Sequence, residues 1–229
     1  FIMQIIYEKH RPKEYKYELD NELKRLEIAK KSFRQIITPQ KFRLDGLTLF
    51  TNKTGAGSSN LFKQQYPPEH FVKEYLHIIS KLWEEELNTE LELTPSWLKT
   101  PTLKESNKLH PDFNSKTETE LLNILSRKSL IYKNKDRYVV HGDLCPVNII
   151  FDSNGHAIGL IDLGDMHIGN RMLDIAILSW TIRGNFGKRY ENMFLEALGL
   201  GPSDEIIEYF RLVYDLSLPD YKKWNWIKE

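Results

Sequence analysis

The sequence lacks the features that staple small secreted domains or anchor proteins in membranes. It contains one cysteine, Cys145, which excludes an internal disulfide and a zinc site built from several cysteines. No stretch approaches the roughly 20 consecutive apolar residues that cross a bilayer, and residues 1–7 lack the cationic lead of a signal peptide. We therefore expect a cytoplasmic protein with no membrane partner.

A net charge of either sign is also missing. Lys plus Arg and Asp plus Glu both total 32, so no excess of basic residues indicates a nucleic-acid partner. The charges are unevenly distributed, however, because residues 191–220 hold seven acidic residues and one base, Arg211. This segment suits a cationic ligand, although a solvated acidic face explains it equally well.

Glycine is absent before Gly46. The chain starts Phe1-Ile2-Met3, inside an apolar run that is typical of a mostly buried strand. We therefore expect that residues preceding Phe1 in the full protein are missing from this sequence.

The apolar residues form patterns that predict an α+β protein. The composition, 41% hydrophobic and 28% charged, is typical of a globular chain. Apolar residues at helical spacing predict helices near residues 19–33, 71–83, 174–182, 190–198 and 203–216. A capping box formed by Thr117 and Glu120 predicts the start of another helix. Short apolar runs predict strands near residues 1–7, 35–38, 47–51, 148–151 and 156–161.

A stretch rich in Gly, Ser and Asn divides these elements into two groups. We expect a small N-terminal lobe over residues 1–51, a linker over residues 52–66, and a mainly helical lobe over residues 67–229. The long segment 93–115, rich in Pro, Ser, Asn and Lys, is expected to be a surface loop.

The most informative segment lies around a predicted hairpin. Asp152-Ser-Asn-Gly155 joins two apolar runs, and Asn-Gly tolerates the positive φ of a tight turn. Because a hairpin brings its ends together, Asn148 and Asp162 are expected side by side, with Asp143 on the preceding loop. Two carboxylates and an amide converge in this arrangement.

Oxygen ligands of this kind suit Mg²⁺, and the spacing matches phosphoryl transfer. In the kinase template four residues separate the base Asp from the metal-binding Asn, and a later Asp-x-Gly supplies the second metal ligand. Asp143 and Asn148 have this spacing, and Asp162-Leu163-Gly164 follows. The three residues could instead only cap turns, but their shared spacing favours the catalytic explanation.

His141-Gly-Asp143, Asn148, Ile161-Asp-Leu-Gly-Asp165 and Leu173-Asp-Ile-Ala176 together resemble the aminoglycoside phosphotransferase family of small-molecule kinases. The resemblance is strongest over residues 138–216 and is closest to the kanamycin-kinase branch. It implies a protein-kinase-like fold with two lobes, ATP and Mg²⁺ as cofactors, and a small substrate that is cationic.

The resemblance also implies roles for individual residues. Asp143 would be the catalytic base, His141 would organise its loop, and Asp174 would support it. Glu22 would pair with a strand lysine that holds the nucleotide. The segment Leu47 to Thr51 would line the adenine, with Leu49 and Thr51 as the contacting residues. Asn148 and Asp162 would hold magnesium. Asp165 would support the site and meet the substrate. The charge of residues 191–220, rather than the resemblance, adds Asp204, Glu205, Glu208 and Asp215 as a wall for a cationic substrate, although these acids could simply face solvent.

One position departs from the family pattern. Gln4 stands where the phosphate-holding lysine is expected, and a neutral amide cannot supply that charge, unless Lys9 serves instead. Two alternatives to an aminoglycoside kinase therefore stay open. The protein could phosphorylate a metabolite such as an amino alcohol, a sugar or homoserine, or it could bind a ligand without transferring phosphate.

Overall fold

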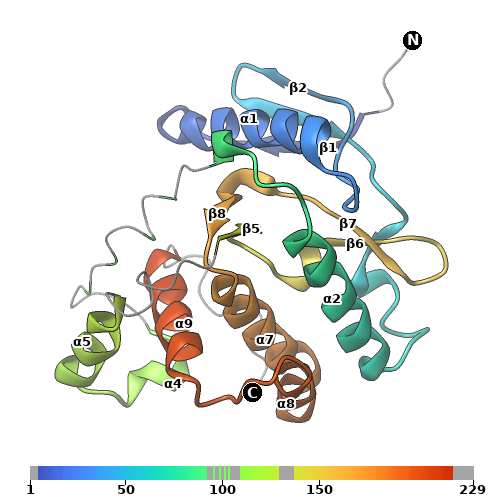
Figure 1. Ribbon diagram of the computed structural model, residues 1–229. Helices are drawn as coiled ribbons and strands as arrows, with labels where there is room; N and C mark the ends of the chain where they lie inside the picture. Colours follow the sequence, from blue (N-terminus) through green and yellow to red (C-terminus); the bar gives the residue numbers. More distant parts are fainter. Residues whose placement is uncertain are drawn as a thin grey trace.

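The structure is a computed structural model that describes residues 5–91, 95, 98, 101, 103, 109–128 and 137–218 (Figure 1). In Figure 1 a sheet and one helix form the upper part, most helices form the lower part, and the hairpin of β6 and β7 lies between them. No helix among these residues combines the length and apolar character needed to cross a bilayer.

The N-terminal part is an antiparallel sheet covered by one helix. The sheet has the order β1-β3-β2, built from β1 (Ile5–His10), β2 (Phe42–Asp45) and β3 (Thr48–Asn52). Helix α1 (Lys16–Ser32) follows the short 3₁₀ helix η1 (Lys13–Tyr15) and buries Leu19 and Leu26. The helix predicted at 19–33 is confirmed. The first residues of the predicted strand 1–7 lie outside the described residues.

One N-terminal prediction needs correction. Residues 35–38 form no strand; Ile37 makes one isolated parallel bridge to Gly159, where a Cβ would lie 2.2 Å from the Ile37 carbonyl oxygen. The strand predicted at 47–51 is confirmed as β3, the central strand of the sheet. A strand in that place pairs on both edges with its neighbours.

Two small strand groups organise the second part. The hairpin of β6 (Ile149–Phe151) and β7 (Ala157–Leu160) is confirmed, and β4 (Gly57–Ser58) adds to β6. Part of the predicted linker 52–66 is therefore a strand of this sheet. Strand β5 (Tyr138–Val140) pairs with β8 (His167–Gly169) beside it.

The remaining elements are helical. The α-helices are α2 (Pro68–Trp83), α4 (Pro111–Asn114), α5 (Glu118–Ser126), α7 (Met172–Phe186), α8 (Lys188–Ala197) and α9 (Glu205–Ser217). Short 3₁₀ helices are η2 (Ser59–Leu61), η3 (Thr89–Leu91), η4 (Pro146–Asn148) and η5 (Leu163–Asp165). The predicted capping box of α5 is present. The N-cap of α9 is Asp204 rather than Ser203, because the Asp204 carboxylate accepts from the backbone N–H groups of Ile206 and Ile207.

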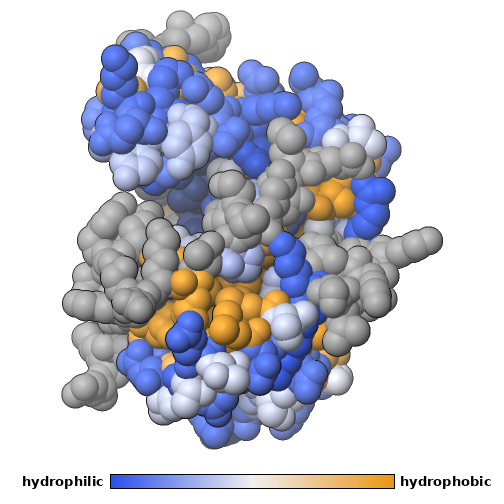
Figure 2. All heavy atoms as spheres, turned by 90° about the vertical axis from the view of Figure 1, so that its left-hand side faces the viewer, coloured by the Kyte–Doolittle hydropathy of each residue, from blue (hydrophilic) through white to orange (hydrophobic). Residues whose placement is uncertain are grey.

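Helix α7 is buried along most of its length between α8 and α9. Trp180, at 1% exposure, lies at its centre. Figure 2 shows one face of the molecule, with hydrophilic side chains over the upper part and apolar side chains gathered over the lower, helical part.

A buried ion pair joins α8 to α9 within this core. Arg211 Nη2 lies 2.6 Å from Glu191 Oε1 and 2.7 Å from the Ser179 hydroxyl oxygen. The Glu191 and Arg211 side chains are almost fully buried. Each charge therefore depends on the other, because neither can be solvated by water.

We expect Arg211→Met to lower the free energy of unfolding by about 3–5 kcal/mol, because it leaves the Glu191 carboxylate buried without its main cation. Urea unfolding measures the loss. Arg43→Met is the control, since the Arg43–Asp45 pair is exposed and should contribute less than about 1 kcal/mol. Equally small losses of the free energy of unfolding in both variants would show that the buried pair stabilises the protein no more than the exposed pair does.

Candidate active site

The loop after β5 is held in place by a carboxylate from α7. Asp174 is fully buried and accepts hydrogen bonds from the backbone N–H groups of His141 (2.8 Å) and Gly142 (3.0 Å). Gly142 has φ +85°, and a Cβ at this position would lie 2.5 Å from the Asp165 carbonyl oxygen. The supporting role predicted for Asp174 thus has a geometric basis.

His141 connects this loop to the end of the hairpin. Its side chain is buried, Nε2 lies 2.9 Å from the Ile161 carbonyl oxygen, and Nδ1 lies 3.3 Å from the Asp143 backbone nitrogen. A neutral ring with its proton on Nε2 satisfies both contacts, because Nδ1 then accepts. His141 therefore orients the backbone at Asp143 without entering the cavity described below.

Asn148 and Asp162 meet at the open end of the hairpin, as predicted. The Ile161 backbone N–H donates to the Asn148 carbonyl oxygen at 3.0 Å, which places Asp162 one residue beyond. Asn148 Nδ2 donates to the Asp143 carbonyl oxygen at 2.9 Å. The three predicted residues are thus brought together by one loop and one hairpin.

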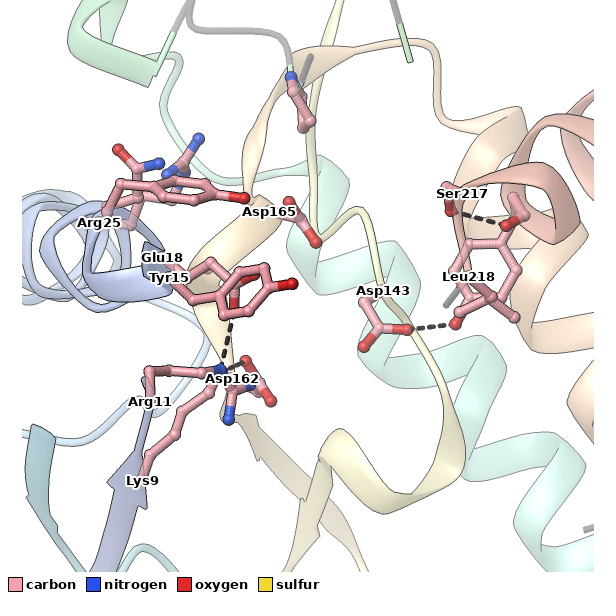
Figure 3. A pocket seen from close by; sticks show the side chains of 15 residues that line it. Lys9, Arg11, Tyr15, Glu18, Arg25, Asp143, Asp162, Asp165, Ser217 and Leu218 are labelled. Carbon is pink, nitrogen blue, oxygen red and sulfur yellow. Dashed lines mark hydrogen bonds and ion pairs between the residues drawn. The ribbon is translucent and has the colours of Figure 1, made fainter. Parts of the chain in front are cut away.

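Asp162 has an uncommon backbone conformation. Its φ and ψ are both 58°, and it is the one residue other than glycine with positive φ in the described part of the chain. Such left-handed geometry costs about 1 kcal/mol or more for a residue with a side chain. The conformation turns the chain directly into η5 and leaves the Asp162 carboxylate facing the cavity (Figure 3).

Lys9 on β1 is the cation of the site. Its Nζ lies 2.7 Å from Glu22 Oε2. The same Nζ lies 2.6 Å from Asp162 Oδ1, as Figure 3 shows. The interpretation of Gln4 as the residue in the lysine position is therefore wrong; Gln4 itself lies outside the described residues. The composition of a short apolar run does not determine which of its residues occupies a given position in the strand.

The charges around Lys9 determine its protonation. Burial lowers the pKa of the Lys9 ammonium, but the charges of Glu22 and Asp162 and their hydrogen bonds outweigh burial, so that the pKa is raised. Burial raises the pKa of Asp162, but the charge and the hydrogen bond of Lys9 outweigh burial, so that this pKa is lowered. The pKa of Glu22 is raised, because burial and the charge of Asp162 outweigh the effect of Lys9. These shifts favour an ionised Lys9–Asp162 pair, with Glu22 hydrogen-bonded to the same ammonium group.

A cavity of about 390 Å³ opens beside these residues. Figure 3 shows Lys9, Asp162 and Asp165 on one side and Asp143 across from them. The lining residues come from β1 and the segment after it, from α1, from the loop after β5, from η5 and from the end of α9. Besides those already named, they include Arg11, Tyr15, Tyr17, Glu18, Asn21, Arg25, Gly164, Tyr214, Ser217 and Leu218. Of the predicted substrate-binding acids, Asp165 lines it.

The four other acids predicted to bind substrate do not form one wall of this cavity. Asp204 caps α9, and the exposed Glu205 lies 3.9 Å from Arg127. Glu208 pairs with Arg127 at 2.7 Å and with Lys116. Asp215 is fully buried and accepts from the His110 backbone N–H at 2.8 Å. Because these four carboxylates have structural partners, their presence is explained without a ligand.

Leu49 and Thr51 also lie away from the cavity lining. Leu49 is buried in β3, in register opposite Lys9, and Thr51 pairs with Tyr7 in the same sheet. Their predicted contact with adenine stays a prediction. Leu49 supports the strand that carries Lys9.

The donor groups fit a magnesium ion held together with phosphate. No cluster of three His, Cys, Asp or Glu side chains forms a metal site within the described ranges. Mg²⁺ commonly takes one or two protein oxygens and completes its shell with phosphate and water. The Asp162 carboxylate would offer one such oxygen, and the Asn148 amide oxygen would offer a second, because the amide nitrogen already donates to Asp143.

Several residues of the site were not predicted. Arg25 on α1 donates to the Met166 carbonyl oxygen, just after η5, and so ties α1 to the loop that carries Asp162. Tyr214 on α9 donates to Asp143. Neither belongs to a recognisable motif, since each contact joins residues far apart in sequence.

The buried Asp174 makes stability depend on pH. Burial raises its pKa to about 6, against the lowering effects of His141 and of the two backbone hydrogen bonds. The native state therefore keeps a proton that the unfolded chain releases near pH 3.8, so the stabilising contribution of this group is lost as the pH rises from about 4 to about 6.

We expect the free energy of unfolding of the wild type, relative to Asp174→Asn, to fall by about 3 kcal/mol between pH 4 and pH 7. Urea unfolding at several pH values measures this difference. Asp45→Asn, at an exposed position, should show no comparable slope. A wild type and an Asp174→Asn variant with parallel pH curves would contradict the assignment.

Comparison with known proteins agrees with this geometry. Residues 68–209 match the model of the phosphotransferase enzyme family. A probable aminoglycoside 3'-phosphotransferase from Lactococcus lactis is 34% identical over 89 residues, which are 38% of this chain and 33% of that protein. An aminoglycoside 3'-phosphotransferase from Niallia circulans is 37% identical over 81 residues, 34% of this chain and 30% of that protein. The matched segments thus span about a third of these relatives.

The fold extends beyond the matched sequence. An aminoglycoside phosphotransferase from Streptomyces rimosus superposes with a TM-score of 0.67 at 20% identity, covering 93% of this chain and 86% of its own. A choline kinase from Streptococcus pneumoniae gives 0.54 at 18% identity, covering 91% and 73%. The predicted protein-kinase-like α+β fold is confirmed. Since the family match covers most of the chain and includes the catalytic loop, the hairpin and η5, the chain belongs to the phosphotransferase enzyme family.

Proposed function

We propose that the protein transfers the γ-phosphoryl group of ATP to a hydroxyl group of a small molecule, and that this molecule is an aminoglycoside. The observation that carries the proposal is that Lys9, Asp143 and Asp162 line one open cavity. Asn148 is hydrogen-bonded to Asp143, and Glu22 forms an ion pair with Lys9. Each part required by phosphoryl transfer has a matching side chain there.

Each residue has a distinct task in this proposal. Lys9, held by Glu22, supplies a positive charge for the phosphates of the nucleotide. Asp162 and Asn148 would hold Mg²⁺, which when bound neutralises charge on the phosphates. Asp143 accepts the proton of the acceptor hydroxyl as its oxygen bonds to the γ-phosphorus, and the bond to the β-phosphate oxygen breaks to release ADP.

Nucleotide use is supported by relatives of the same fold. The Streptomyces rimosus aminoglycoside phosphotransferase has been solved in complex with ADP and streptomycin. The position of Lys9 also removes the reason for treating the chain as a binding protein without activity, because the required lysine is present. A cytoplasmic location stays a prediction.

The charged lining of the cavity favours a polar acceptor. The acidic residues Glu18, Asp143, Asp162 and Asp165 and the basic residues Lys9, Arg11 and Arg25 line it. Glu18 pairs with Arg11 and Asp162 with Lys9, so Asp143 and Asp165 are the acids proposed to meet a cationic acceptor. The curated relatives named above carry aminoglycoside phosphotransferase names, which favours an aminoglycoside over other amines. An amino alcohol is the second candidate, because the choline kinase shares the fold.

We expect Asp143→Asn and Asp162→Asn to fail at different steps. Loss of the base at Asp143 should lower kcat by roughly 10² or more and leave ATP affinity nearly unchanged. Loss of the metal ligand at Asp162 should abolish Mg²⁺-dependent ATP binding. Steady-state kinetics and calorimetric titration with ATP distinguish the two, with Asp45→Asn as an exposed control. Normal turnover by Asp143→Asn would reject its role as the base.

We expect the wild type to consume ATP with kanamycin-class aminoglycosides and not with neutral sugars. Asp165→Asn should raise KM for the aminoglycoside, and added salt should weaken binding in the wild type more than in the variant, because one attractive charge is gone. A coupled ADP-release assay measures both. Turnover with choline and none with any aminoglycoside would move the assignment to the second candidate.

A further inference from the structure

A tyrosine from the end of α9 contacts the proposed base. The Tyr214 hydroxyl donates to Asp143 Oδ1 at 2.6 Å. This distance is typical of a charge-assisted O–H···O⁻ bond, the stronger class of side-chain hydrogen bond. The contact at the other carboxylate oxygen is longer, because Asn148 Nδ2 lies 3.5 Å from Asp143 Oδ2.

The helix that carries Tyr214 is fixed in the core. Its neighbours Val213 and Asp215 are fully buried, and Asp215 is hydrogen-bonded to the His110 backbone. Helix α9 also packs along α7, which supplies Asp174 to the catalytic loop. The phenol and the loop backbone are therefore held by the same pair of helices.

The phenol is a hydrogen-bond donor near neutral pH. Burial raises the pKa of Tyr214 well above its ordinary value, and the nearby negative charge of Asp143 raises it further. The Tyr214 hydroxyl therefore keeps the proton that it donates to Asp143.

We propose that Tyr214 is a positioning residue that holds the Asp143 carboxylate in the orientation in which it receives the acceptor proton, an inference that rests on the proposed function. A carboxylate has about four lone-pair sites, so the bond from Tyr214 leaves room for the acceptor hydroxyl. Both residues line the cavity, where Figure 3 shows Asp143 facing the α9 end marked by Ser217 and Leu218.

A competing explanation uses the same contact. The phenol could occupy the place of the acceptor hydroxyl and have to leave before substrate binds. The two explanations predict opposite kinetics for Tyr214→Phe, which keeps the ring and removes only the hydroxyl oxygen.

The test is steady-state kinetics of Tyr214→Phe with ATP and an aminoglycoside. A positioning role predicts that kcat falls about tenfold or more, as for one lost charge-assisted hydrogen bond, while KM for both substrates changes little. In the Asp143→Asn background the same change should have almost no further effect, because Tyr214 acts through Asp143. Tyr209→Phe, buried on the same helix and outside the cavity lining, is the matched control.

Other outcomes overturn the inference in different ways. A lower KM for the acceptor with an unchanged or higher kcat would show that the phenol competes with substrate. Unchanged kinetics would show that the bond has no functional role, and an additional loss in the Asp143→Asn background would show that Tyr214 acts independently of Asp143. Absence of turnover in the wild type with every acceptor would instead reject the proposed function.

Discussion

The interaction on which the site depends is the ion pair of one lysine with two carboxylates. Lys9 comes from β1, Glu22 from α1 and Asp162 from the loop after β7, so two consecutive N-terminal elements and a segment much later in the sequence meet at a single ammonium group. Without it, two carboxylates would face each other across a partly buried space, which is strongly unfavourable. The same cation that stabilises this junction is the one that a nucleotide phosphate would meet.

A second polar junction fixes the catalytic loop. Asp174 binds two consecutive backbone N–H groups, and His141 links the loop to the end of the hairpin. Buried polar groups cost free energy unless they find partners, so this arrangement permits few alternative loop conformations. Asp143 and Asp162 are consequently held by separate sets of contacts. The contacts that fix the Asp143 loop come from the helical core, and those that fix Asp162 come from β1 and α1.

Local patterns predicted the structure well where the contacts are local. The hairpin from Asn148 to Asp162 and the capping box at Thr117 depend on residues close in sequence, and both are present. The register of β1 was not predictable from one short apolar run, which is why Gln4 was placed in the position that Lys9 occupies. Tyr214 was also out of reach, because 71 residues separate it from Asp143.

The acidic segment shows a different limit of sequence interpretation. Its net charge favoured a cationic ligand, but Asp204 serves the start of α9 and Glu208 pairs with two basic side chains. Charge counted along the chain ignores cations from other elements, such as Arg127. Asp165, the one predicted substrate-binding acid in the cavity lining, was singled out by its place in a motif rather than by charge.

The central claim is that Lys9 holds the phosphates of the nucleotide. It is tested most directly by calorimetric titration of Mg²⁺ and a non-hydrolysable ATP analogue into the wild type, Lys9→Met and Gln4→Met. We expect Lys9→Met to weaken binding about tenfold or more, because a charge-assisted contact with phosphate is lost, and Gln4→Met to bind like the wild type. Normal binding by Lys9→Met together with a loss in Gln4→Met would contradict the account.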